Sequence, residues 1–343
     1  KYHVPDTCTI RYINDDFLLH DFPDRYDYVI GNPPFFKLKA SDPRLPLYRL
    51  EAKNKNTSNI CSFFLEKSLR LAKYVALVFP KFLLNTPEFS TTRAELAQKS
   101  VDAILDFGEK GFPGILVETI AIFINNLAAP ANTKVFSLTH RLHLTQPQAY
   151  IFDPELPYWI IYRNQLFDSV CRKLDFDVFE VFRDRQLTNK LLSSSGELRV
   201  LKSRNLSDDG KEILDIPGYD SYISYAAAKP LSVFQYFDAP NVYITPNMTY
   251  KPRMMKKPLH CLVNGSLAIL IPKKDFTLSE KQLSYFSTEE YRTFYQIARN
   301  FQTRSLNVDS CSVFFYGLLR DEPKSSRSDS TEPIQLSFDD CVK

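Results

Sequence analysis

The chain has 343 residues, 24% of them charged and 44% hydrophobic, and its formal net charge is +3. So small a net charge excludes a uniformly basic surface, so any basic surface must be local. No apolar run approaches the length of a membrane-spanning helix, no signal peptide opens the chain, and the six cysteines are widely scattered. This pattern predicts a cytoplasmic protein with reduced thiols and neither a disulfide framework nor a metal site.

The first part of the chain alternates apolar runs with amphipathic segments. Strands are expected over residues 9–18, 26–32, 75–80, 101–108 and 118–125, and helices over 59–74 and 90–100. A Glu66–Arg70 pair supports the first helix, and Ser90 or Thr91 is placed to cap the second. Apolar strands alternating with helices predict an α/β sheet that is covered on both faces.

The regular alternation of strands and helices ends near residue 146, and the length of the chain favours two domains. A Pro-rich stretch and one helical segment precede short strands broken by Gly, Pro and Asn, and a helical segment over 279–300 follows. The expected divisions are an α/β domain at 1–145, a linker or helical connection at 146–182, a mixed, strand-rich domain at 183–320 and a polar, disordered tail at 321–343.

The stretch YVIGNPPFF places two prolines directly after an expected strand. Proline lacks a backbone donor and has a fixed φ, so the pair ends the strand in a rigid corner. Ligands of α/β sheets bind beyond the carboxyl ends of strands, which is where this corner lies. The Asn32 side-chain oxygen and the unpaired backbone carbonyls suit an exocyclic amine, and Phe35 suits stacking on a planar base.

Such acceptors would favour attack of the amine on a methyl group, through alignment and electrostatics rather than a strong base. The plainer interpretation is that Asn-Pro-Pro is only a turn.

The segment around the corner is INDDFLLHDFPDRYDYVIGNPPF, and it resembles motifs III and IV of amino-methylating DNA methyltransferases of the TaqI-like, gamma-ordered kind. The similarity continues in SFFLEKSLRLAKYVALVFPKFLL and in ILDFGEKGFPGILVETIAIFI, which resembles the strand pair around motif VIII. It covers residues 9–126 in detail, and the later part resembles a target-recognition domain more loosely. The resemblance implies part of a Rossmann-like methyltransferase sheet, S-adenosylmethionine as methyl donor, and a flipped adenine in double-stranded DNA as target.

The family's corner residues hold the target base. By this resemblance Asn32 and the Pro33 carbonyl, stiffened by Pro34, would accept from the target amine, and Phe35 would stack on the base. Phe112 in GFPG would supply a second ring, with an ordinary core or loop position as the alternative. Phe36, next to the corner, is assigned to packing.

The same resemblance assigns the cofactor's adenine end. Asp16 matches the acid that contacts the adenine amine of S-adenosylmethionine, and Phe17 would pack nearby. A turn or helix-cap carboxylate is the alternative, and the adjacent Asp15 leaves the register open.

Local positive charge marks the second domain, where basic side chains suit contacts with phosphates and Asn, Gln and Arg suit base edges. The residues assigned to DNA contact are Lys251, Arg253, Lys256, Lys257 and Arg304. A solvated loop is the alternative interpretation of this cluster.

One departure from the family is clear. No glycine-rich cofactor loop lies before Asn32, and the whole chain has only nine glycines. We therefore expect a second polypeptide or a missing N-terminal segment to carry that loop, because the cofactor's methionine end needs such a cradle. The chain alone is then expected neither to bind cofactor well nor to turn over.

The resulting expectation is a site-specific adenine-N6 DNA methyltransferase of a restriction–modification system, acting at the bacterial nucleoid. Two alternatives stay open: a non-catalytic DNA-specificity subunit of a methyltransferase complex, and a glutamine or RNA methyltransferase with the same NPPF corner.

Overall fold

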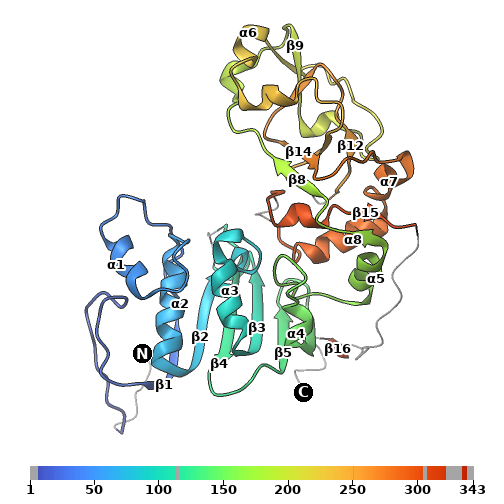
Figure 1. Cartoon of the computed structure of the whole chain (residues 1–343). Helices are drawn as coiled ribbons and strands as arrows, with labels where there is room; N and C mark the ends of the chain where they lie inside the picture. Colours follow the sequence, from blue (N-terminus) through green and yellow to red (C-terminus); the bar gives the residue numbers. More distant parts are fainter. Residues whose placement is uncertain are drawn as a thin grey trace.

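The computed structural model describes residues 7–112, 114, 116–249, 251–303 and 307–321, and the backbone of 334–337. An α/β sheet lies at one end of the molecule and a strand-rich region at the other, with a helical layer between them (Figure 1). Within the described part, no helix is long and apolar enough to cross a membrane.

The first sheet has seven strands in the order β1-β2-β4-β3-β5-β6-β16. Their bounds are β1 Tyr26–Gly31, β2 Ala72–Pro80, β3 Ser100–Gly108, β4 Thr119–Asn125, β5 Asn132–Ser137, β6 Leu142–Pro147 and β16 Ile334–Ser337. β1 runs parallel to β2 and β3 parallel to β5, whereas β4 is antiparallel to both of its neighbours. The start of β4 therefore lies at the same edge of the sheet as the carboxyl ends of β1, β2 and β3.

Helices cover one face of this sheet. They are α2 Ile60–Leu71, α3 Ser90–Ala97 and α4 Gln148–Ile151, and α1 Arg44–Glu51 packs against α2 rather than on the sheet. α2 and α3 lie on the same side (Figure 1), and Val75 and Leu77 of β2 are buried in a core shared with α2. The alternate residues Ala76 and Val78 are only partly buried. The expected α/β architecture is confirmed, but in the described part helices cover the sheet on one face rather than on both.

The two helices expected near the sheet differ in how they begin. Asn59 caps α2, because its side-chain oxygen accepts a hydrogen bond from the Cys61 backbone N–H. The residue before α3 is Phe89, and no described side chain caps that helix. The expectation that Ser90 or Thr91 caps α3 is therefore wrong.

The expected Glu66–Arg70 pair does not form among the described residues. The Glu66 carboxylate accepts instead from the backbone N–H groups of Lys53 and Asn54. Arg70 binds the Glu51 carboxylate at 3.1 Å. Burial raises the pKa of Glu66, and these two backbone donors oppose that shift.

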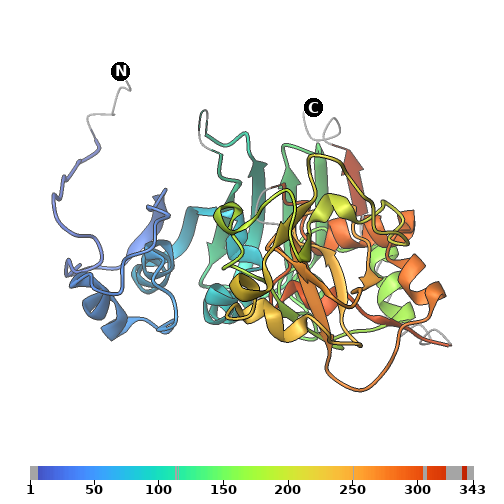
Figure 2. The same cartoon turned by 90° about the horizontal axis from the view of Figure 1, so that it is seen from above.

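Residues 9–18 also differ from expectation, because they form no strand. A strand needs a neighbour to pair its backbone groups, and this segment runs outside β1, away from the rest of the sheet (Figure 2). The apolar alternation in the sequence therefore did not lead to a ladder here.

A helical layer continues the core of the sheet. It contains α5 Gln165–Lys173, α7 Glu280–Tyr285 and α8 Glu289–Ala298. The rings of Phe167 on α5 and Phe294 on α8 stack with centroids 4.9 Å apart. One hydrophobic core runs from the sheet through Trp159 to these helices. The segment at 146–182, expected to be a linker or a helical connection, thus contains the helix α5 and packs into the core.

The strand-rich region is built from small sheets, β12-β11-β14-β8, β10-β9-β13 and β15-β7. The bounds are β7 Leu174–Asp175, β8 Phe179–Phe182, β9 Leu198–Leu201, β10 Ser221–Ile223, β11 Tyr243–Pro246, β12 Met255–Lys256, β13 Cys261–Val263, β14 Leu267–Pro272, β15 Leu318–Leu319 and α6 Tyr225–Ala228. The described short 3₁₀ turns are Lys81–Leu84, Pro87–Phe89, Asn189–Leu191, Ser203–Asn205, Ser232–Tyr236 and Ser312–Phe315.

Two of the expected domain boundaries differ from those in the structure. β8 already belongs to the strand-rich region, so that region begins before residue 183. At the other end, β16 pairs antiparallel with β6 at the edge of the first sheet, so the expectation of a wholly disordered tail at 321–343 is wrong for 334–337.

A buried ion pair lies at the edge of the sheet that also holds the Asn-Pro-Pro corner. Lys81 follows β2 directly, and its Nζ lies 2.7 Å from a carboxylate oxygen of Asp106 on β3. A Glu118 oxygen lies 3.7 Å from the same Nζ, and the Tyr162 hydroxyl donates to Asp106. The Lys81 and Asp106 side chains are 2% and 0% exposed, so each charge depends on the other for compensation.

This pair generates a stability prediction. Replacing Lys81 by Met is expected to lower the free energy of unfolding by about 3–5 kcal/mol, because two carboxylates would stay buried without their cation. The matched control is Lys73→Met, since Lys73 forms an exposed ion pair with Asp27. It is expected to change the free energy of unfolding far less, because water screens this exposed pair. Urea unfolding measures both values, and equal losses would contradict this account of the buried pair.

Candidate active site

The Asn-Pro-Pro-Phe corner borders a hollow of about 360 Å³ at the carboxyl end of β1. Its described lining consists of Asn32, Pro33, Pro34, Phe35, Phe112, Val117 and Thr119. The structure therefore brings the corner together with Phe112, although about eighty residues of sequence and two further strands separate them. The common edge of β1 and β4 is what places them side by side.

The corner is fixed from behind by the start of α2. The Asn59 side chain donates to the Phe35 carbonyl at 3.5 Å, and the Ile60 backbone N–H donates to the Phe36 carbonyl at 3.1 Å. Pro33 is buried, and Phe35 packs against the main core. The same Asn59 that caps α2 thus also ties down the corner, a role that the sequence analysis missed although its capping position could have drawn attention to it.

The front of the corner is open. Asn32 is exposed, and its side chain forms no hydrogen bond with any residue in the described part. Its amide oxygen can therefore accept a hydrogen from a ligand in the hollow. Phe36 is 50% exposed, so the assignment of Phe36 to packing is wrong.

The opposite wall is set by tight backbone packing. A Cβ placed on Gly111 would lie 2.3 Å from the Thr119 hydroxyl and 3.0 Å from the Phe107 Cβ. Only glycine fits this approach, and it holds the neighbouring Phe112 against the start of β4. Thr119 pairs with Pro80 on one side and with Gly108 on the other. Val117 and Thr119 were not identified from the sequence, since no local pattern marks them as lining residues.

Asp16 and Phe17 lie away from this hollow, on the segment that precedes β1, and neither is among its described lining residues. One Asp16 oxygen accepts from the Leu18 backbone N–H at 2.9 Å, and the other accepts from the Tyr48 hydroxyl at 2.5 Å. Burial, and then this hydrogen bond, raises the pKa of Tyr48 to about 12. The Phe17 ring stacks on Phe64, with centroids 4.9 Å apart.

The neighbouring Asp15 has a different environment. It is exposed and bonds to the His20 ring at 2.8 Å, and this bond lowers the pKa of Asp15. Of the two candidates, Asp16 is the one held against the α1–α2 pair through Tyr48.

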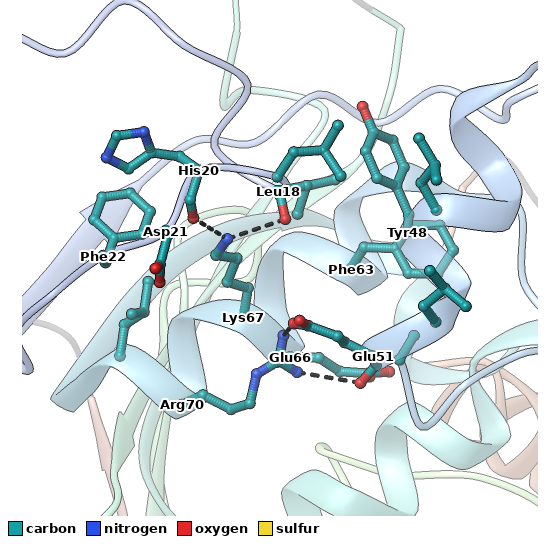
Figure 3. Close-up of a pocket in the computed structure, with 15 residues that line it drawn as sticks. Leu18, His20, Asp21, Phe22, Tyr48, Glu51, Phe63, Glu66, Lys67 and Arg70 are labelled. Atoms are coloured by element: carbon teal, nitrogen blue, oxygen red, sulfur yellow. Dashed lines mark hydrogen bonds and ion pairs between the residues drawn. The ribbon is translucent and has the colours of Figure 1, made fainter.

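A larger hollow, of about 540 Å³, lies beside this segment between residues 18–22, α1 and α2. Figure 3 shows Lys67 reaching from α2 to the segment, where its Nζ donates to the Leu18 and His20 carbonyls at 3.0 and 2.6 Å. The Nζ also lies 5.8 Å from the centre of the Phe17 ring. Lys67 therefore fixes the segment that carries Asp16 and Phe17 to the rest of the domain.

The residues assigned to DNA contact divide into two groups. Lys251 and Lys256 are exposed, and the Lys251 Nζ lies 3.5 Å from an Asp208 oxygen. Arg304 lies outside the described residues. Arg253 is only 8% exposed, and its guanidinium donates to the backbone carbonyls of Ser203 and Leu206.

Lys257 is 2% exposed and donates to the carbonyls of Phe237 and Pro258. The assignment of Arg253 and Lys257 to phosphate contacts is therefore corrected, because their charged ends are occupied by the fold itself. Sequence alone could not separate them from Lys251 and Lys256.

The buried Lys257 leads to a pH prediction. Burial lowers the pKa of this amine from 10.5 to about 8. Between these pH values the unfolded chain holds a proton that the folded chain lacks, so the free energy of unfolding should rise with pH, by roughly 3 kcal/mol at most. Lys257→Met should lack this rise, whereas Lys256→Met should keep it. Denaturation curves from pH 7 to 11 test this, and parallel profiles for all three proteins would contradict it.

Residues 10–112 match the model of the Eco57I restriction-modification methylase family. This range contains Asp16, the Asn-Pro-Pro-Phe corner and Phe112, which are the residues that carry the geometry above. A search of curated proteins finds no match to the chain.

Solved structures with partial similarity include a type I restriction-modification system methyltransferase subunit from Streptococcus thermophilus, at 21% identity and a TM-score of 0.32 over 38% of this chain and 30% of that one. The type IIL restriction-modification enzyme MmeI in complex with DNA gives 11% identity and a TM-score of 0.48, over 84% of this chain and 46% of that one. The type IIG restriction endonuclease BpuSI gives 11% identity and a TM-score of 0.38, over 87% of this chain and 47% of that one.

The chain spans less than half the length of each of these three proteins. The family match over residues 10–112 confirms the resemblance to restriction–modification methyltransferases that the corner segment predicted.

Proposed function

We propose that the chain carries the target-amine half of the active site of an adenine-N6 DNA methyltransferase of a restriction–modification system. The observation that carries this proposal is the hollow between the Asn32–Phe35 corner and Phe112, which lies within the matched family segment. A base could reach it only after leaving the DNA helix, because a paired base is not accessible to such a recess.

The corner supplies hydrogen-bond acceptors. The Asn32 amide oxygen and the Pro33 carbonyl would accept the two hydrogens of the target amino group. In the free base the nitrogen lone pair is delocalised into the ring, so the nitrogen is a weak nucleophile. Two fixed acceptors favour its pyramidal form and stabilise the positive charge that develops as it attacks, which is preorganised electrostatic catalysis without a general base.

The aromatic side chains hold the base in place. Phe35 is partly buried, and the core behind it keeps its ring in position. Phe112 faces the same hollow from the opposite wall. Stacking of a base on an aromatic ring contributes roughly 1–3 kcal/mol, which is enough to offset much of the unstacking that extrusion requires.

S-adenosylmethionine, when bound, supplies the electrophilic methyl group. Asp16 and Phe17 are assigned to its adenine end, and their contacts fit that role in part. Asp16 is only partly buried, and a carboxylate can accept hydrogen bonds beyond those from Leu18 and Tyr48. Phe17 is fixed by Phe64 on one side. These side chains can orient an adenine, whereas a cradle for the methionine end must come from residues outside this set.

We infer that this cradle arrives on a polypeptide segment that pairs with the free edge of β1. In the described part, β1 pairs only with β2. Tyr28 and Ile30 on β1 are 65% and 79% exposed, an unusual state for large apolar strand residues. A further strand would satisfy the backbone of this edge, and the segment that brings it could also cover Tyr28 and Ile30, which lie on the face opposite α2. The segment would belong to a second polypeptide or precede the residues seen here.

The strand-rich region is proposed to bind double-stranded DNA beside the hollow. Lys251 and Lys256 are the exposed basic side chains of the expected cluster and are available to phosphates.

Replacing Asn32 by Ala tests the catalytic proposal. We expect the methylation rate constant of the assembled enzyme on duplex DNA to fall roughly 10²–10³-fold, because one preorganised acceptor is lost at the reacting amine. DNA affinity should change less than about twofold, since the amide adds no charge to the surface. Tritium transfer from labelled S-adenosylmethionine measures the rate, and Asn132→Ala, at an exposed strand position, is the matched control.

The same variant separates the alternative functions. A non-catalytic specificity subunit would keep full methylation by its complex after Asn32→Ala. A glutamine or RNA methyltransferase would lose activity, but on protein or RNA and not on duplex DNA. Either result would contradict the adenine-N6 proposal.

Replacing Ile30 by Lys tests the proposed edge contact. Because Ile30 is 79% exposed, the isolated chain should fold and bind DNA unchanged. In the assembled enzyme the arriving segment would cover this face and bury the new charge, so assembly should weaken at least tenfold, as measured by co-purification and by restored methylation. Leu127→Lys, at a position 66% exposed beyond β4, is the control. Equal assembly of both variants would rule out this edge.

A further inference from the structure

The segment that follows α8 has an uncommon backbone. Asn300 and Phe301 both have a φ of 51°, in the left-handed region. Asparagine tolerates this conformation, but for phenylalanine it is strained, so surrounding contacts must hold it. Asn300 is fully buried, accepts from the Ile161 backbone N–H at 2.9 Å and donates to the Trp159 carbonyl at 2.8 Å.

The next two residues reach the edge of the first sheet that holds the hollow. Gln302 is 2% exposed, and its side chain is paired with that of Asn85, the residue after the turn that ends β2. Thr303 is exposed and meets the loop between β3 and β4. This loop, residues 109–118, includes Phe112.

Thr303 connects the two ends of that loop. Its backbone N–H donates to a Glu118 carboxylate oxygen at 3.0 Å, and its hydroxyl donates to Glu109. Glu109 opens the loop and Glu118 closes it, so one residue holds both ends at once. The Glu118 carboxylate is also near Lys81, which ties this end to the buried ion pair below.

The first turn of α8 and the residues just before it contact the strand-rich region. Arg292 donates to the Asp208 carbonyl at 3.3 Å, and Ser287 donates to the Asp209 carbonyl at 2.8 Å. The Asp208 carboxylate is the group that lies near Lys251. A single helix therefore joins the exposed basic side chains to the loop that carries Phe112.

We propose that Thr303 is a positioning residue that holds Phe112 against the target base, so that the recognition half of the chain completes the base-binding hollow. This inference rests on the proposed function and adds to it a role for a residue that does not line the hollow. α8 acts as the rigid connection, and the strained turn at residues 300–301 aims Thr303 at the loop.

The test uses Thr303→Val in the assembled enzyme, which removes the hydroxyl but keeps the shape and the backbone donor. We expect the methylation rate constant to fall about tenfold, the typical effect of losing a hydrogen bond to a charged group. The KM for S-adenosylmethionine and the Kd for DNA should change less than about twofold. Thr303→Ser should restore the rate, and Thr293→Val is the matched control, because the Thr293 hydroxyl donates within α8, to the Glu289 carbonyl.

A double-mutant cycle with Phe112→Ala shows whether Thr303 acts through the ring. Once Phe112 is absent, adding Thr303→Val should lower the rate by less than about twofold. A further tenfold loss, or a Thr303→Val effect equal to that of Thr293→Val, would overturn the inference. If Thr303→Val fails to fold, Glu109→Leu removes the same bond from the loop side and should give the same cycle.

These experiments distinguish a failure of the proposed function from a failure of the role of Thr303. If Asn32→Ala and Phe112→Ala both leave methylation unchanged, the proposed function and this inference fail together. If both variants lose activity while the cycle is additive, only the role of Thr303 fails.

Discussion

The candidate site depends on one constraint, the antiparallel insertion of β4 between β2 and β3. Because β4 runs against its neighbours, it starts where the others end. The Asn-Pro-Pro corner after β1 and the loop before β4 therefore meet across the end of β2. A wholly parallel arrangement would put the start of this strand at the opposite edge, about one strand length away from the corner. The direction of β4 therefore determines that the hollow exists, and the side chains then determine what it can bind.

Around this edge the fold uses polar groups as fixed supports. Asn59 holds the corner from behind, and the Lys81–Asp106 pair fixes the ends of β2 and β3. Such buried groups do little for net stability compared with apolar packing, but their geometry is specific, and removing one partner is expensive. These neighbours hold the backbone of the corner, and with it the Pro33 carbonyl, whereas the exposed Asn32 amide would be held by the ligand itself. Rigidity of this kind is what preorganised electrostatic catalysis requires.

The basic cluster of the strand-rich region shows how similar side chains can have opposite roles. Lys256 and Lys257 are neighbours on the chain, yet the first is exposed and the second is buried with its amine on two carbonyls. Side chains in an extended segment alternate between faces, so consecutive residues diverge when one face packs. A run of basic residues in a sequence therefore identifies candidates for DNA contact, but it does not show which of them are exposed.

The sequence by itself determined the parts whose signals are local. The apolar strands from β1 to β4, the helix after Asn59 and the rigid corner all follow from residue patterns and proline geometry, and the motif resemblance is matched by the family found over residues 10–112. Tertiary structure alone decided what depends on partners distant along the chain. It left residues 9–18 without a ladder, paired β16 with β6, placed Val117 and Thr119 in the hollow, and brought Thr303 to the Phe112 loop. The physical reason is that a hydrogen bond or a cavity wall needs a second element, and its position is set by the packing of the whole sheet rather than by neighbours in sequence.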